Sequence, residues 1–87
     1  MRAIRFVPDA WVDDLYWQAQ DKATLKRINL LITAAAMDPF EGIGKPEALR
    51  GDPSGYWSRR IDATNRLVYR ATDAELVVIA CRFHYDD

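Results

Sequence analysis

The residue with the clearest chemical potential is His84, the only histidine of the 87-residue chain, which lies beside Tyr85 near the C-terminus. An imidazole can both give and take a proton near neutral pH, whereas it adds nothing to the end of an apolar strand. A lone histidine at a strand end is also compatible with a solvated side chain. His84 is therefore a candidate acid–base residue that needs partners elsewhere in the sequence.

A second candidate is Glu47, in a glycine- and proline-rich segment that runs from residue 39 to residue 55. So long a connection in so small a domain is typically functional or disordered. Glu47 can be a solvated acid at the start of a short turn after Pro46, or it can act as a proton acceptor. The same segment also contributes two cations, Lys45 and Arg50.

Basic residues are concentrated in one part of the chain. The formal charge is −1, which gives little general attraction to a polyanion. Between residues 45 and 70, however, six basic and three acidic residues give a local charge of +3 and leave −4 elsewhere. This asymmetry indicates either local contact with a structured RNA or a solvated, charged sheet face. The six basic residues are Lys45, Arg50, Arg59, Arg60, Arg66 and Arg70.

Length and composition predict a single domain over residues 1–87. A chain of this size buries only about 60–65% of its unfolded surface, which suffices for one core. No apolar tract is long enough to span a membrane and no export signal is evident, so we expect a cytoplasmic protein without membrane contact. Cys81 lies in an apolar run and is expected to be a buried thiol. One histidine and one buried cysteine make a poor zinc site, so we expect no metal or cofactor.

The N-terminal half predicts a strand followed by two helices. Residues 2–7 form a short extended run that stops at Pro8. Helical spacing then predicts one helix that ends near Gln20 and another that Asp21 caps and that ends before Asp38. We expect both apolar stripes to be core. They are Trp11, Val12, Leu15, Tyr16 and Ala19 in the first helix, and Leu25, Ile28, Leu31, Ile32, Ala35 and Ala36 in the second.

The C-terminal half predicts three strands, at residues 56–61, 66–71 and 76–83, separated by short polar turns. Such strands form an antiparallel meander. The order β-α-α-β-β-β then gives an α+β fold, with a helical hairpin packed on one face of an antiparallel sheet. The other face of this sheet is expected to be open.

Strand alternation predicts which residues share the open face. In the middle strand, Leu67 and Tyr69 should point toward the helices and Arg66 away from them. In the last strand the better core set consists of Val77, Ile79, Cys81 and Phe83, because the alternate set would bury Arg82 and His84. Arg66, Arg82 and His84 should then project from the open face. This register requires an odd-length loop around residues 73–75.

Four segments in this order resemble the YoeB (Txe/YoeB) toxins of bacterial toxin–antitoxin pairs, which belong to the RelE superfamily of ribosome-dependent mRNA endonucleases. The segments are FEGIGKPE at residues 40–47, SGYWSRRI at 54–61, RLVY at 66–69 and ACRFHY at 80–85, with a further match at 11–17. The resemblance runs from about residue 4 to residue 85. It implies a RelE-like, microbial-ribonuclease-like fold.

The resemblance implies a catalytic set of Glu47, Arg66, His84 and Tyr85. Glu47 would take a proton from the 2′-hydroxyl of RNA, Arg66 would stabilise the charge on phosphorus, and His84 would protonate the departing 5′-oxygen. Tyr85 would orient the substrate. Ordinary pKa values of ~4.3 and ~6.5 suit this assignment, although strong shifts would let Glu47 and His84 exchange roles. We expect Glu47, Arg66 and His84 to converge on the open face.

Further arginines and one lysine are expected to contact the substrate. Arg59 and Arg60 point to opposite faces of their strand, so only one of them can join the site directly, and the match to the family favours Arg60. Lys45 and Arg50 are expected to contact the backbone of ribosomal RNA or mRNA. The expected substrate-binding residues are therefore Arg60, Lys45, Arg50, Arg59 and Arg82.

The resemblance also implies partners: a cognate, YefM-like antitoxin whose disordered segment folds over the toxin, the ribosome and its mRNA, and operator DNA only through the antitoxin complex. Related toxins pair, so a homodimer is also expected. Two other functions stay open. One is a same-fold toxin with a different target, such as DNA gyrase, and the other is a decayed paralogue that only binds antitoxin and operator DNA. Asp86 and Asp87 keep the latter open, because they would place two carboxylates close to the phosphate.

Overall fold

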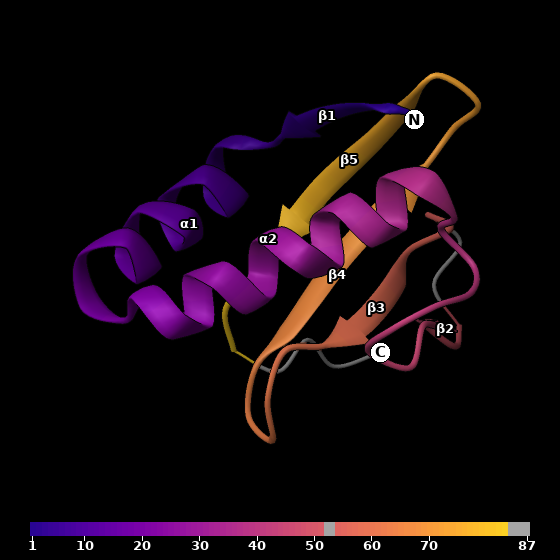
Figure 1. Cartoon of the computed structure of the whole chain (residues 1–87). Coiled ribbons are helices and arrows are strands. Elements are labelled where there is room, and N and C mark those ends of the chain that lie inside the picture. Colours follow the sequence, from indigo (N-terminus) through magenta and orange to yellow (C-terminus); the bar gives the residue numbers. More distant parts are fainter. Residues whose placement is uncertain (52–53, 84–87) are drawn as a thin grey trace.

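The computed structural model describes residues 1–51 and 54–83 as two helices packed on one face of a five-stranded sheet (Figure 1). The α+β class and the predicted order of elements are confirmed, with one additional short strand, β2. No helix within these residues has the length and hydropathy needed to cross a membrane. The elements are β1 (Ala3–Phe6), α1 (Pro8–Gln20), α2 (Lys22–Met37), β2 (Glu47–Ala48), β3 (Trp57–Arg60), β4 (Arg66–Ala71) and β5 (Glu75–Ala80).

The sheet is mixed rather than wholly antiparallel, with strand order β1-β5-β4-β3-β2. β1 runs parallel to β5, with Ala3 opposite Glu75 and Phe6 opposite Val78, whereas the other three pairs are antiparallel. Parallel neighbours need a long connection, and here most of the chain lies between the two strands. A short-range sequence pattern therefore could not indicate this pairing.

The apolar stripe of α2 is core, as predicted, whereas in the predicted stripe of α1 only Tyr16 packs against the core. The buried residues of α1 are Ala10, Asp14 and Trp17, whereas Trp11 and Val12 are exposed. The indole N–H of Trp17 donates a hydrogen bond to the main-chain carbonyl of Cys81 at 2.8 Å. A buried tryptophan needs such a partner, and this bond fixes the face that α1 turns to the sheet. The buried residues of α2 are Ile28, Leu31, Ile32, Ala35 and Ala36.

The connection between β4 and β5 is even in length, contrary to the odd length that we predicted. Ala71 lies opposite Leu76, and the N–H of Thr72 donates to the carbonyl of Glu75 at 2.8 Å, which leaves a two-residue loop, Asp73-Ala74. Side chains alternate along a strand, so an even loop exchanges the two faces of β5 relative to an odd one. Leu76 therefore packs in the core.

The rest of β5 follows from this register and from one bulge. Val78 joins the core cluster in place of Val77, which is buried outside that cluster. One step along β4 then corresponds to two along β5, which makes Ile79 the extra residue of a β-bulge. The bulge returns Cys81 to the core, as predicted, where burial and then nearby Asp13 raise the pKa of its thiol to about 12. Val77 is buried as predicted, but on the sheet face away from the helices, where Val68 is buried too. The predicted core positions of Ile79 and Phe83 are wrong.

Arg59 is the largest fully buried side chain of the described residues. Its Nε donates to the hydroxyl of Tyr69 at 3.0 Å, and that hydroxyl donates to the carbonyl of Pro39 at 2.6 Å. Arg59 thus lies inside the protein rather than on the substrate-facing surface where the sequence analysis placed it. Its two terminal nitrogens donate to three main-chain carbonyls, those of Asp38 at 2.6 Å, Glu41 at 2.9 Å and Ile43 at 3.0 Å.

Replacement of Arg59 tests the importance of this buried network. Arg59→Met should lower the free energy of unfolding by about 2–4 kcal/mol, because it leaves a phenol and several carbonyls without their donor. Arg60→Met, on the opposite and exposed side of the same strand, should change it by no more than about 0.5 kcal/mol. Urea unfolding of both variants provides the measurement. Equal effects would show that the network contributes nothing particular to stability.

Candidate functional site

The sheet face opposite the helices carries an ion pair between Glu47 and Arg66. Nη1 of Arg66 lies 3.2 Å from Oε1 of Glu47. Glu47 belongs to β2 and Arg66 begins β4, with β3 between the two strands. The Arg66 side chain is only 17% exposed, whereas that of Glu47 is 64% exposed. Two of the three residues expected to converge on this face are therefore in contact.

Strand register explains why these side chains meet. Glu47 lies opposite Ser58 across β2 and β3, and Arg60 lies opposite Arg66 across β3 and β4. Directly opposed residues share a face, and alternate residues of one strand share it too. Glu47, Ser58, Arg60 and Arg66 therefore lie on the same face. Arg59, between Ser58 and Arg60, points the other way.

Ser58 is a member of this group that the sequence analysis missed. Its side chain is fully buried, and its hydroxyl lies 3.5 Å from Nη1 of Arg66. The alternation along β3 could have indicated it, because a residue two positions before Arg60 must share the face of Arg60. The hydroxyl and the Glu47 carboxylate both approach the same guanidinium nitrogen.

Arg60 and Arg66 place two positive charges directly opposite each other. The N–H of Arg60 donates to Gly44 at 2.7 Å and that of Arg66 donates to Phe83 at 3.0 Å, so the two residues do not hydrogen-bond each other. In such pairs the Cα atoms are only about 4.5 Å apart. Opposed like charges destabilise a sheet, and the carboxylate of Glu47 balances only one of them. The arrangement is therefore suited to bind an anion.

The other two cations of this region flank β2. Lys45 and Arg50 are exposed, two residues before and three residues after Glu47 in the sequence. Both therefore lie at the surface next to the short strand that carries the carboxylate. They extend the basic surface beyond the arginines of the sheet, and long side chains at these positions can reach a flexible polyanion.

Arg82 does not share the open face with Arg66 as predicted. Its guanidinium carbon lies 3.4 Å from the ring centroid of Tyr16, in α1, and 4.3 Å from that of Phe83. β5 ends at Ala80, so Arg82 lies beyond the strand, and the alternation that had placed it beside Arg66 no longer applies. Stacking on two aromatic rings then holds the cation against α1.

The positions of His84 and Tyr85 lie outside the described residues. Phe83, which directly precedes them, is within that range, and its carbonyl accepts the 3.0 Å hydrogen bond from the N–H of Arg66. The main chain of Phe83, one residue before His84, is thus hydrogen-bonded to Arg66, the first residue of β4. Among residues 1–51 and 54–83, no three histidine, cysteine or acidic side chains are grouped as metal ligands would be.

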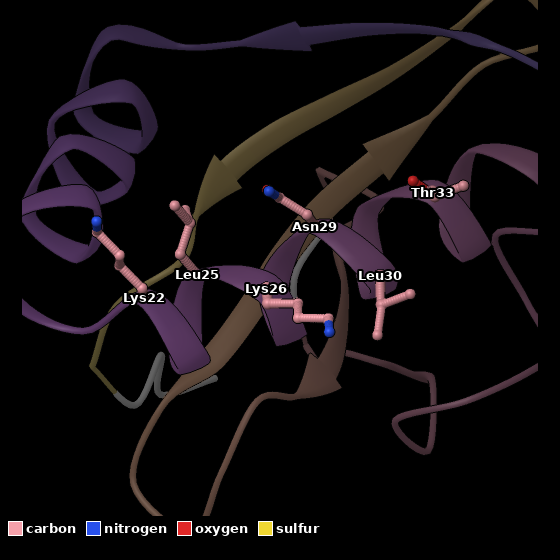
Figure 2. Close-up of a pocket in the computed structure, with 6 residues that line it drawn as sticks. All are labelled: Lys22, Leu25, Lys26, Asn29, Leu30 and Thr33. Atoms are coloured by element: carbon pink, nitrogen blue, oxygen red, sulfur yellow. The ribbon is translucent and has the colours of Figure 1, made fainter.

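A groove of about 310 Å³ lies along α2 (Figure 2). Because α2 packs on the core face of the sheet, the groove and the Glu47–Arg66 pair lie on opposite sides of it. The groove therefore takes no part in the candidate site. The residues that line it are Lys22, Leu25, Lys26, Asn29, Leu30 and Thr33.

Several known proteins are similar to this chain over nearly its whole length. The family model described as the YoeB-like toxin of bacterial type II toxin–antitoxin systems matches residues 6–85. Toxin YoeB of Synechocystis sp. is 58% identical over 82 residues, which cover 94% of this chain and 95% of that protein. Toxin RelK of Mycobacterium tuberculosis is 56% identical over 85 residues, which cover 98% of this chain and 100% of that protein.

Solved structures share the fold. The YoeB/ParE toxin from Agrobacterium tumefaciens has a TM-score of 0.89 at 47% identity, covering 95% of this chain and 99% of its own. A YoeB dimer from Staphylococcus aureus has a TM-score of 0.90 at 41% identity, covering 97% and 98%. YoeB in a heterotetrameric YoeB–YefM complex from the same organism has a TM-score of 0.86 at 41% identity, covering 98% and 99%.

The charge balance of the site can be tested by unfolding at two salt concentrations. Glu47→Gln should lower the free energy of unfolding by about 0.5–1 kcal/mol at low salt, because Arg66 then opposes Arg60 without its counter-charge. The loss should shrink near 1 M salt, where the Debye length is only about 3 Å. Asp73→Asn, in the β4–β5 loop, is the control for the loss of an exposed carboxylate. A loss independent of salt would mean that Glu47 does not act through its charge.

Proposed function

Because this chain belongs to the YoeB-like toxins of bacterial type II toxin–antitoxin systems, we propose that it is a ribosome-dependent, metal-independent mRNA endonuclease that inhibits translation. The observation that carries the proposal is the Glu47–Arg66 pair, with Arg60 directly opposite Arg66 on the same sheet face. A carboxylate beside two cations offers a proton acceptor and a phosphate site within one surface. A purely structural ion pair has no use for the second arginine, which weakens the sheet.

The proposed reaction is an attack of RNA on its own backbone. Glu47 takes the proton of a 2′-hydroxyl, and that oxygen forms a bond to the adjacent phosphorus. Arg66 and Arg60 stabilise the negative charge that develops on the phosphate oxygens. His84 gives a proton to the 5′-oxygen as the P–O bond breaks, which leaves a 2′,3′-cyclic phosphate and a 5′-hydroxyl. Tyr85 holds a neighbouring base by stacking.

The ion pair also gives the free protein a defined resting arrangement. Arg66 is occupied by Glu47 when no phosphate is present. An incoming phosphate competes for the same guanidinium, whose fork of donors suits either group. Substrate binding thus releases the carboxylate to act as a base, while Ser58 remains next to the arginine that holds the phosphate.

The protein partners follow from the family and from one exposed surface. We infer a YefM-like antitoxin as the cognate inhibitor, because a YoeB–YefM complex is known from Staphylococcus aureus. Operator DNA would be contacted only through that complex, in the cytoplasm. A homodimer is supported by the YoeB dimer of the same organism and by the exposed apolar residues Trp11, Val12 and Leu15 of α1.

Mutation of Arg66 separates catalysis from folding. Arg66→Ala should lower the single-turnover cleavage rate on programmed ribosomes by roughly 100-fold or more, because a preorganised cation at a phosphoryl transition state supplies several kcal/mol. Loss of the ion pair should cost at most about 1 kcal/mol because Glu47 is 64% exposed, and thermal unfolding measures this cost together with the packing lost at the largely buried Arg66 side chain. Arg70→Ala is the matched control, on the same strand and face but about 13 Å along it. Normal cleavage by Arg66→Ala would remove this residue from the mechanism.

The ribosome requirement can be tested by comparing cleavage of one mRNA in isolation and on ribosomes. Cleavage of isolated mRNA should be at least about 100-fold slower than cleavage of the same mRNA on ribosomes, because few phosphate contacts cannot hold a flexible strand in reactive geometry. Deletion of Asp86 and Asp87 should strengthen binding modestly without creating activity on isolated mRNA. Comparable rates in the two states would indicate a general ribonuclease instead.

A further inference from the structure

Phe83, the residue before His84, is held by two main-chain hydrogen bonds. Its N–H donates to Oδ1 of Asn65 at 2.7 Å, and its carbonyl accepts the N–H of Arg66 at 3.0 Å. Its φ angle is +67°, which a side-chain-bearing residue rarely adopts and keeps only when the surroundings enforce it. β5 ends at Ala80, so these bonds hold a segment that no longer belongs to the sheet.

Asn65 is itself held in place by the turn between β3 and β4. The carboxylate of Asp62 accepts the N–H of Thr64 at 2.8 Å, the N–H of Asn65 at 2.7 Å and the side-chain amide of Asn65 at 3.2 Å. Burial would raise the pKa of Asp62, but the hydrogen bonds from Asn65 and Thr64 outweigh it and lower that pKa. The Asn65 amide therefore bridges two segments, with its nitrogen on Asp62 and its oxygen on Phe83.

This bridge gains little apolar burial. Phe83 is 59% exposed, and the hydrogen bond from Phe83 to Asn65 is itself at the surface. Exposed hydrogen bonds contribute only modestly to stability. What the bridge does provide is a fixed path: the adjacent residues Asn65 and Arg66 hold the main chain of Phe83, while the Arg66 side chain serves the phosphate site.

We propose that Asn65 is a positioning residue for the cleavage reaction, which fixes through Phe83 the direction in which the chain enters His84. The inference rests on the proposed function, in which His84 protonates the leaving 5′-oxygen. In the proposed reaction Arg66 binds the phosphate, and its N–H also holds the carbonyl of Phe83, the residue that directly precedes the acid. A displacement of about 1 Å at a reacting group can cost roughly 100-fold in rate.

The test compares two leaving groups on programmed ribosomes. One mRNA carries the natural 5′-oxygen at the cleavage site and the other a 5′-bridging sulfur, which departs as a thiolate without needing a proton. Asn65→Ala should cleave the natural mRNA roughly 10- to 100-fold more slowly than the unmodified protein. It should cleave the sulfur mRNA within about 2-fold of it, because the step that Asn65 supports is then unnecessary.

The matched control is Thr72→Ala. The Thr72 hydroxyl accepts from the N–H groups of Ala74 and Glu75 in the β4–β5 loop, so it supports a turn without touching Phe83. This variant should cleave both messages normally. If Asn65→Ala lowers the melting temperature more than Thr72→Ala does, the cleavage assays use Asn65→Ser in place of Asn65→Ala. A serine side chain is one bond shorter than that of asparagine and does not reach the N–H of Phe83.

The outcomes separate the inference from the function on which it rests. His84→Ala should show the same pattern as Asn65→Ala, with a larger loss on the natural mRNA. Suppose that the sulfur mRNA restores cleavage to His84→Ala. If Asn65→Ala then cleaves both messages equally slowly, or cleaves both at the normal rate, Asn65 has no positioning role. If sulfur does not restore cleavage to His84→Ala, then His84 is not the acid, and both the assigned chemistry and the inference fail.

Discussion

The structure depends on one buried cation. Arg59 extends from β3 into the interior, where a charge is tolerated only when hydrogen bonds compensate for lost water. Carbonyls from residues 38–43 and the hydroxyl of Tyr69 supply them, so the guanidinium joins the end of α2, the following segment and β4. The segment after α2 passes so close to that helix that a Cβ on Gly44, whose φ is +85°, would lie 2.7 Å from the side chain of Leu31. This packing fixes where the chain begins β2.

The candidate site inherits its geometry from that constraint. β2 contains only two residues, too few to hold its own place, yet it carries Glu47 to the side of β3 that Arg59 does not occupy. The same alternation that buries Arg59 exposes Arg60 opposite Arg66. One strand thus contributes a buried arginine that stabilises the fold and an exposed one that completes an anion site. Stability and chemistry are divided between the two faces of β3.

Local sequence patterns predicted the elements better than their relations. Asp21 and the Asp38-Pro39 pair mark the ends of α2 because caps act within one turn. The faces of β5 depended on a two-residue loop and a bulge, and the face of α1 on a bond from Trp17 to Cys81, all of which are tertiary facts. Alternation separated Arg59 from Arg60, but the acceptors that draw Arg59 inward come from a remote segment. Glu47 had no periodic signal, so only the family resemblance linked it to Arg66.

The chemistry assigned to this face is most directly tested by the ends of the cut RNA. Attack by the 2′-hydroxyl, with Glu47 as base and Arg66 on the phosphate, must leave a 2′,3′-cyclic phosphate on one fragment and a 5′-hydroxyl on the other. Mass spectrometry of a short mRNA cleaved on programmed ribosomes identifies both ends. We expect this pair of ends from the unmodified protein, and neither end from the Glu47→Gln variant in the same time. A 3′-hydroxyl and a 5′-phosphate would contradict the assigned chemistry, because those ends require attack by water.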